Sequence, residues 1–239
     1  DTLEVNAATG AFNDSVTVDD DMVVVDSPDP ANDITVNYTD IDTLQVNTDA
    51  GDDEITITLD NDATPLPDSI DIGGGDDTDT LVIEGTTLAD AISVGAGGVG
   101  GGVNIGVSGI EELAINGLTG DDLIELNLPL PFGLDSVTVD GGLGEDTLVV
   151  RTGTLDDNVD LDSVDMDVTL DVGGASDIVK IDYNNGVESL DIQTQDGDDN
   201  VVVTVGENAG DLPANVNING GSHIVEDRVT IQGTAGDNT

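Results

Sequence analysis

The sequence repeats one arrangement of short apolar runs and acidic glycine turns three times. Apolar runs at 44–46, 113–115 and 190–192 recur at intervals of 69 and 77 residues. The same intervals separate the Gly-Asp-Asp turns at 51–53, 120–122 and 197–199. In each copy a later Gly-Gly pair leads to an aspartate and another apolar run, at Asp79, Asp146 and Asp227. Agreement at this many positions predicts a repeat array, in which each unit packs on its neighbours.

The apolar residues follow a period of two. Residues 55–59 read Ile-Thr-Ile-Thr-Leu and residues 136–139 read Ser-Val-Thr-Val, which is typical of strands with one buried face. No stretch keeps a 3.6-residue period for three turns, and aromatic residues are only 2% of the chain. This pattern argues against disorder and predicts an all-β protein with a thin aliphatic core.

About six short strands per period of about 70 residues favour a parallel β-helix, or β-solenoid, with about three coils per period. In such a fold one turn recipe recurs at one edge of the stack. The alternative is a run of tandem antiparallel β-sandwiches. The Gly-rich stretch 94–107 is interpreted as a flexible bulge between coils.

The predicted organisation is one elongated array over 1–239. It divides into a partial repeat at 1–40, repeats at 41–109 and 110–186, and a partial repeat at 187–239. Both ends open in the middle of a repeat. Two explanations are left: the array continues in a longer protein, or its open ends pair with identical chains as a homopolymer.

The charge is almost entirely negative. Acidic residues number 52 against three Lys and Arg, for a net charge of −49. Such a chain is not expected to bind nucleic acid or an anionic membrane surface, because both interactions require basic side chains. No apolar run approaches the ~18 residues of a membrane span, so membrane insertion is not expected. The absence of cysteine excludes disulfides and thiolate metal sites.

The acid is mostly aspartate, with 42 Asp and 10 Glu. Asp on a Gly turn offers carboxylate and carbonyl oxygens, which are the ligands that Ca²⁺ prefers. Neighbouring carboxylates also repel one another, so folding requires divalent ions or salt screening. The alternative is a hydrated acidic surface adapted to high salt. The candidate calcium ligands fall into two turn classes: Asp52, Asp53, Asp121, Asp122, Asp198 and Asp199 in the first, and Asp76, Asp77, Asp79, Glu145, Asp146, Glu226 and Asp227 in the second.

Residues 141–149, Gly-Gly-Leu-Gly-Glu-Asp-Thr-Leu-Val, fit the calcium-binding nonapeptide G-G-x-G-x-D-x-U-x at every fixed position. The chain therefore resembles the acidic β-repeat regions of large secreted bacterial surface proteins and adhesins that carry RTX-like motifs. The related stretches reach Asp79 with one extra residue and Asp227 with two, and the nonapeptides are not in tandem. The resemblance implies calcium binding, an extracellular or cell-surface location and an adhesive or structural role.

These observations together predict a calcium-stabilised structural or adhesive repeat protein, such as a filament or surface-layer subunit that stacks end to end, with surface glycans as candidate partners. An enzyme is not expected. The alternative is a polysaccharide-acting β-helix enzyme or a carbohydrate-binding module, in which Arg151 or Arg228 would act beside Asp146 or Asp227.

Overall fold

The computed structural model describes residues 1–7, 12–28, 33–59, 66–100, 103–130, 134–162, 167–171, 178–183, 186–205, 212–222 and 226–233. Every regular element in these ranges is a β-strand. These ranges contain no helix that is long and apolar enough to cross a membrane.

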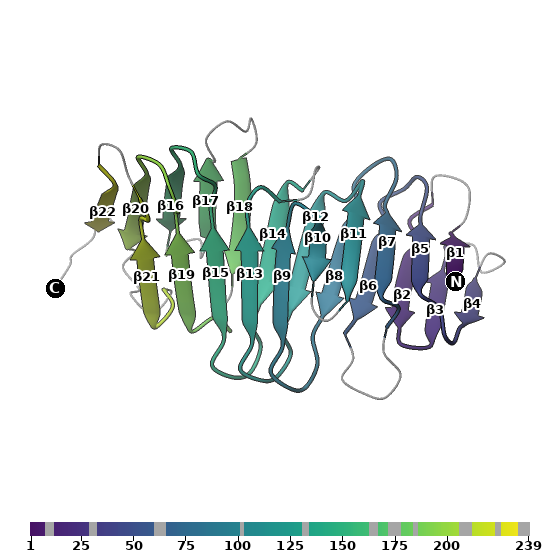
Figure 1. The fold of residues 1–239 in the computed structure, drawn as a ribbon. Coiled ribbons are helices and arrows are strands. Elements are labelled where there is room, and N and C mark those ends of the chain that lie inside the picture. The colour runs from purple at the N-terminus through teal and green to yellow at the C-terminus, as the bar shows by residue number, and fades with distance from the viewer. Residues whose placement is uncertain are drawn as a thin grey trace.

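The strands form two long sheets that lie face to face (Figure 1). The ten-stranded sheet contains, in spatial order, β1 (Thr2–Asn6), β5 (Thr43–Asn47), β7 (Ser69–Gly73), β11 (Asn104–Ser108), β10 (Gly98–Gly100), β9 (Ala91–Gly95), β13 (Leu123–Asn127), β15 (Thr147–Arg151), β19 (Ser189–Gln193) and β21 (Asn215–Asn219). The twelve-stranded sheet contains, from the same end, β4 (Ile34–Asn37), β3 (Met22–Asp26), β2 (Ser15–Asp19), β6 (Glu54–Thr58), β8 (Thr80–Glu84), β12 (Glu112–Asn116), β14 (Ser136–Asp140), β18 (Ile178–Tyr183), β17 (Asp167–Asp171), β16 (Asn158–Asp162), β20 (Asn200–Val205) and β22 (Arg228–Gly233).

Within each sheet nearly all neighbouring strands are parallel. Among the described strands, only β3, β10 and β17 run against their neighbours. The all-β prediction is confirmed, and two mostly parallel sheets agree with a solenoid rather than with antiparallel sandwiches. The chain coils between the sheets, because parallel neighbours in one sheet are joined through a strand of the other.

The core is a stack of aliphatic side chains between the two sheets. Strand registers align Leu44 with Ile70 and Ile70 with Ile105 on successive coils, and all three side chains are fully buried. The apolar alternation predicts this burial correctly, because successive residues of a strand point to opposite faces. Each coil therefore covers the apolar row of the coil before it.

Two edges join the sheets. At the first edge the chain passes from the ten-stranded to the twelve-stranded sheet, and at the second edge it returns; in Figure 1 these are the upper and lower edges. Three times the chain stays in one sheet for three consecutive strands, as a meander: β2–β3–β4, β9–β10–β11 and β16–β17–β18. The second meander includes residues 94–100 and 103–107, so the prediction of a bulge there is wrong for those residues.

The meanders also overturn the prediction that one turn recipe recurs at one edge. From β5 to β11 the chain makes seven strands rather than about six, and it crosses between the sheets an odd number of times before β12. The matching apolar runs 44–46, 113–115 and 190–192 therefore lie in the ten-stranded, the twelve-stranded and again the ten-stranded sheet. Their Gly-Asp-Asp turns alternate between the two edges.

Candidate functional site

The most distinctive polar feature is a ladder of carboxylates along the two edges where the chain crosses between the sheets. Each carboxylate lies just before the start of a strand. At the first edge the backbone N–H of Asp14 donates to Asp53 Oδ1 at 2.7 Å. The N–H of Asp53 donates to Asp79 Oδ1, and the N–H of Asp79 to Glu111 Oε2, both at 2.9 Å. Each acid thus accepts the amide of the acid one coil earlier, and four coils are joined in one continuous row.

The same ladder occurs at the second edge in the middle of the chain. The N–H groups of Asp90, Asp122 and Asp146 donate to Asp122 Oδ1, Asp146 Oδ1 and Glu188 Oε2, each at 2.8 Å.

A third ladder returns to the first edge. The N–H of Asp157 donates to Asp199 Oδ1 at 2.9 Å, and that of Asp199 to Asp227 Oδ1 at 3.2 Å. We call these three rows the inner ladders. They link turns 24 to 42 residues apart in sequence.

The inner aspartates are buried, and one oxygen of several lacks a partner. Asp53, Asp79, Asp122 and Asp146 are at most 2% exposed, and the Oδ2 atom of each makes no hydrogen bond. Burial raises the pKa of Asp79 to about 6, and the nearby charges of Asp53, Glu111 and Asp52 add to this, against the lowering effect of the Asp53 amide. Burial also raises the pKa of Asp53, Asp122, Asp146 and Asp199. Ionising these groups inside the fold is therefore costly.

Glycine makes room for the unbonded oxygen. A Cβ on Gly74 would lie 2.6 Å from Asp79 Oδ2 and 1.9 Å from the Gly109 carbonyl oxygen. A Cβ on Gly141 would lie 2.8 Å from Asp146 Oδ2 and 1.9 Å from the carbonyl oxygen of Gly186. In both places an aspartate oxygen and a backbone carbonyl of the next coil face one glycine. A proton on the carboxyl group would turn Oδ2 at this position from an acceptor into a donor.

A second row of acids lies outside the inner ladders. Its hydrogen bonds run from a backbone N–H of one coil to an acid of the coil before: Thr78 N–H donates to Asp52 Oδ1 at 3.2 Å, Glu145 N–H to Asp121 Oδ1 at 3.1 Å, and Asp198 N–H to Asp156 Oδ1 at 3.0 Å. Asp52, Asp121 and Glu145 are exposed. We call this the outer row. In a turn such as Asp52-Asp53, the inner carboxylate therefore accepts an amide from the preceding coil, and the outer carboxylate accepts one from the following coil.

The predicted calcium ligands fall into three groups in the structure. The structure places Asp53, Asp79, Asp122, Asp146, Asp199 and Asp227 in the inner ladders, Asp52, Asp121, Glu145 and Asp198 in the outer row, and Asp76, Asp77 and Glu226 at exposed turn positions. The two predicted turn classes are thus consecutive coils of one ladder.

Sequence reasoning missed five members of the ladders: Asp14, Asp90, Asp157, Glu111 and Glu188. Asp14, Asp90 and Asp157 each stand immediately before an alternating apolar run. That position is shared with Asp53 and Asp122, and it is the signal that would have found them.

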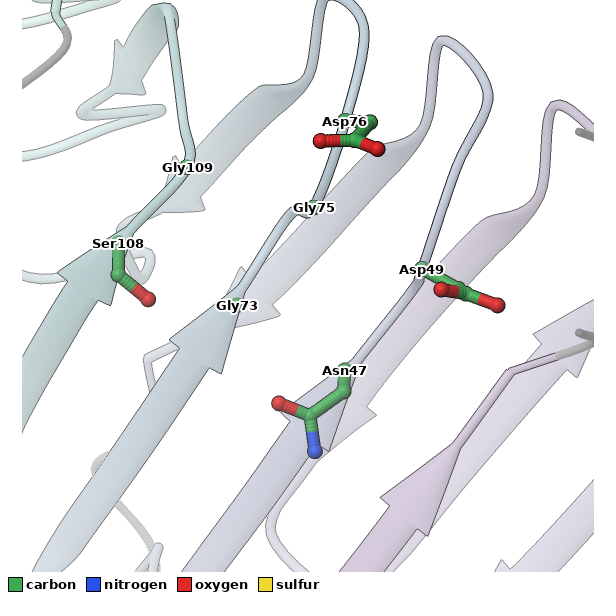
Figure 2. A pocket seen from close by; sticks show the side chains of 7 residues that line it. All are labelled: Asn47, Asp49, Gly73, Gly75, Asp76, Ser108 and Gly109. Atoms are coloured by element: carbon green, nitrogen blue, oxygen red, sulfur yellow. The ribbon is translucent and has the colours of Figure 1, made fainter.

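An open polar groove crosses the first edge beside the first ladder. Figure 2 shows Asn47 and Ser108 at strand ends, with the carboxylates of Asp49 and Asp76 on the turns beyond them. Gly73, Gly75 and Gly109 complete its lining. The turns are joined through backbone, since Asp76 N–H donates to the Asp49 carbonyl at 2.8 Å. The carboxylates of Asp49 and Asp76 lie on separate turns and do not form a cage.

Ca²⁺ takes six to eight oxygens. Within the described ranges, no three or more acidic or histidine side chains converge as they would around a metal ion. The inner aspartates already use Oδ1 for backbone amides, so the inner ladders as they stand do not fit a calcium ion.

Of the two basic residues named for the enzyme alternative, Arg228 follows Asp227 directly in the sequence, whereas Arg151 lies away from Asp146. Arg151 is at the opposite end of β15 from Asp146. Its guanidinium bridges the outer face of the ten-stranded sheet, through Glu125 Oε1 at 2.7 Å, Asn127 Oδ1 at 3.2 Å and Gln193 Oε1 at 3.1 Å. Arg151 therefore neutralises a cross-strand acid instead of sitting beside Asp146.

Comparison with protein families, curated proteins and solved structures found no match to this chain.

Proposed function

We propose that this chain is an extracellular structural or adhesive repeat protein, a β-solenoid of repeats of about 70 residues that serves as a stiff scaffold. The observation that carries the proposal is the hydrogen bonding of the acidic turns, in which the inner ladders and, at three pairs of turns, the outer row join neighbouring coils. Many of the acids that an enzyme would direct at a substrate here accept backbone amides of the preceding or following coil. Residues used in this way stiffen the stack and leave the sheet faces as its main surface.

The charge supports a location where cations are plentiful. Outer-row neighbours such as Asp121 and Glu145 lie on adjacent coils, and both are exposed. Two like charges ~4 Å apart repel by about 1 kcal/mol in water and by more near a protein surface. Cations at the outer row, with calcium as the predicted ion, would relieve this repulsion without disturbing the inner ladders.

The end strands support stacking of copies into a filament. Val229 and Ile231 of β22 are 52% and 73% exposed, whereas Val201 and Val203, their register partners in β20, are buried. The end strands β4 and β22 run in the same direction, and so do β1 and β21. A head-to-tail contact would therefore continue both sheets in parallel and cover these apolar side chains.

Thermal unfolding in calcium chloride, magnesium chloride and sodium chloride at equal ionic strength tests the calcium part of the proposal. Calcium is expected to raise Tm more than sodium does. An equal effect of all three salts would show that diffuse screening suffices.

Electron microscopy of the purified chain tests the scaffold. Rods or end-to-end fibres are expected, with a width set by two sheets. Compact or irregular particles would contradict the scaffold role.

A further inference from the structure

The three meanders give the solenoid an unusual strand order. In a simple coil each new strand is added at the growing edge of its sheet. Here β16 lies next to β20, and the chain then returns through β17 to β18, which pairs with β14. The meanders β2–β4 and β9–β11 repeat this path. The first strand of such a meander thus leaves two positions of its sheet open behind it. The next two strands of the chain then fill those two positions.

This order matters when the chain is peeled from its C-terminal end. Among the described strands, β22 pairs only with β20 and β21 only with β19, so both are edge strands that detach singly. Once they are removed, β20 and β19 become edge strands in turn. The next strand along the chain is β18, which is hydrogen-bonded to β14 on one side and to β17 on the other. Peeling cannot continue strand by strand at that point.

We propose that the meanders are mechanical locks, which stop the solenoid from unspooling one strand at a time and make each meander leave as a unit. This inference deepens the proposed scaffold function, since a tether under load must resist unspooling. The physical property itself depends only on the strand order. A peel from the C-terminal end meets a lock at β18 and a second one at β11.

The locks differ in strength. In the third meander, β17 pairs over five residues with both neighbours, and Val168 and Leu170 are fully buried. Lys180 Nζ of β18 adds an ion pair to Asp167 Oδ2 of β17 at 3.2 Å, and it also contacts Asp182 Oδ1 of its own strand at 2.7 Å. In the second meander, β10 has three residues and pairs over two and three positions. The third lock is therefore the stronger one.

Single-molecule extension tests the proposal. The chain has no cysteine, so Glu112→Cys provides a unique attachment point, and the C-terminus provides the other. We expect an early phase from β19–β22 and then one larger event that releases Asn158–Tyr183 together. That segment would add about 90 Å at ~3.5 Å per residue.

Two leucine variants locate the event. Leu170 in β17 and Leu190 in β19 are equally buried, at 0% and 1% exposure. Leu170→Ala is expected to lower the force of the large event only, and Leu190→Ala that of the early phase only. Equal effects of both variants on the large event would overturn the proposal.

Hydrogen exchange on the unmodified chain tests the same point without a variant. Between β19 and β18 we expect protection to rise by at least about tenfold, with β16–β18 opening as one unit. A gradual rise along the chain, or extension without an event of this length, would refute the locks.

Discussion

Substituting Asp79 separates the two roles that the structure gives a ladder carboxylate. Its Oδ1 accepts the Asp53 amide at 2.9 Å, while Oδ2 is buried without a partner. Asp79→Asn keeps an acceptor at Oδ1 and removes the charge. Its NH₂ group would replace Oδ2 and bring N–H donors to the space beside Gly74, which the Gly109 carbonyl oxygen also faces. Asp79→Ala removes both the charge and the acceptor.

The expected magnitudes follow from the pKa and the hydrogen bond. A carboxyl pKa raised from 3.8 to about 6 destabilises the fold by at most about 3 kcal/mol at neutral pH, at ~1.4 kcal/mol per pKa unit, and by less where solvent screens the charge. Asp79→Asn should therefore be more stable than the unmodified chain at pH 7.5. Losing the acceptor leaves a buried amide unpaired, so Asp79→Ala should be less stable than Asp79→Asn by about 1–3 kcal/mol at any pH.

The pH dependence supplies the control. A carboxyl with a raised folded-state pKa destabilises the fold fully above that pKa, and this effect is lost as pH falls through about 6 toward the unfolded value of 3.8. At pH 3.5 the unmodified chain and Asp79→Asn should have nearly equal stability, with Asp79→Ala still below both.

Denaturant unfolding of the three proteins at pH 7.5 and 3.5 measures these differences in free energy of unfolding. In thermal unfolding, each kcal/mol corresponds to ~2–4 °C in Tm for a chain of this size. Two results would refute the reasoning: an unmodified chain more stable than Asp79→Asn at pH 7.5, or equal stability of the Asn and Ala variants.

Three further predictions follow from the same geometry. Because the ladder aspartates have raised pKa values, Tm should rise as pH falls from 7.5 to 4; a steady fall in Tm over that range would contradict the buried ladders. Gly74→Ala should lose several kcal/mol of stability, because its Cβ would lie 1.9 Å from a carbonyl oxygen. The control Gly97→Ala has no atom within 4 Å of its Cβ, so its stability in denaturant titrations should change by less than about 1 kcal/mol. Arg151→Gln should cost about 1 kcal/mol or less in the same titrations, because its ion pair with Glu125 is partly exposed; a loss of several kcal/mol would mean that this cluster is more than a surface ion pair.

The strands were predictable from the sequence because their signal is local. In runs such as 55–59 a side chain's face follows from its position alone, so alternation predicts both the strand and its buried residues. The exchange of sheets between repeats was not predictable in this way. It depends on whether the Gly-rich stretch near Val99 is a bulge or a meander, and the weak pattern of β10 does not decide that.

The same contrast between local and long-range information applies to the acidic turns. Their composition indicated a structural role for aspartate, but which atom an oxygen contacts depends on the coil above or below, 24 to 42 residues away. Local sequence places Asp53 and Asp79 in different turn classes, because the residues around them differ. They are neighbours because the intervening crossings return the chain to one edge.

Amide hydrogen exchange measured by NMR in the presence of a calcium chelator tests the central claim most directly. The claim is that ladder carboxylates join coils through backbone amides. The amides of Asp14, Asp53, Asp90 and Asp122 should then exchange as slowly as those of the central strands without any bound ion. Fast exchange of these four amides in chelator, with protection only after calcium is added, would contradict the account.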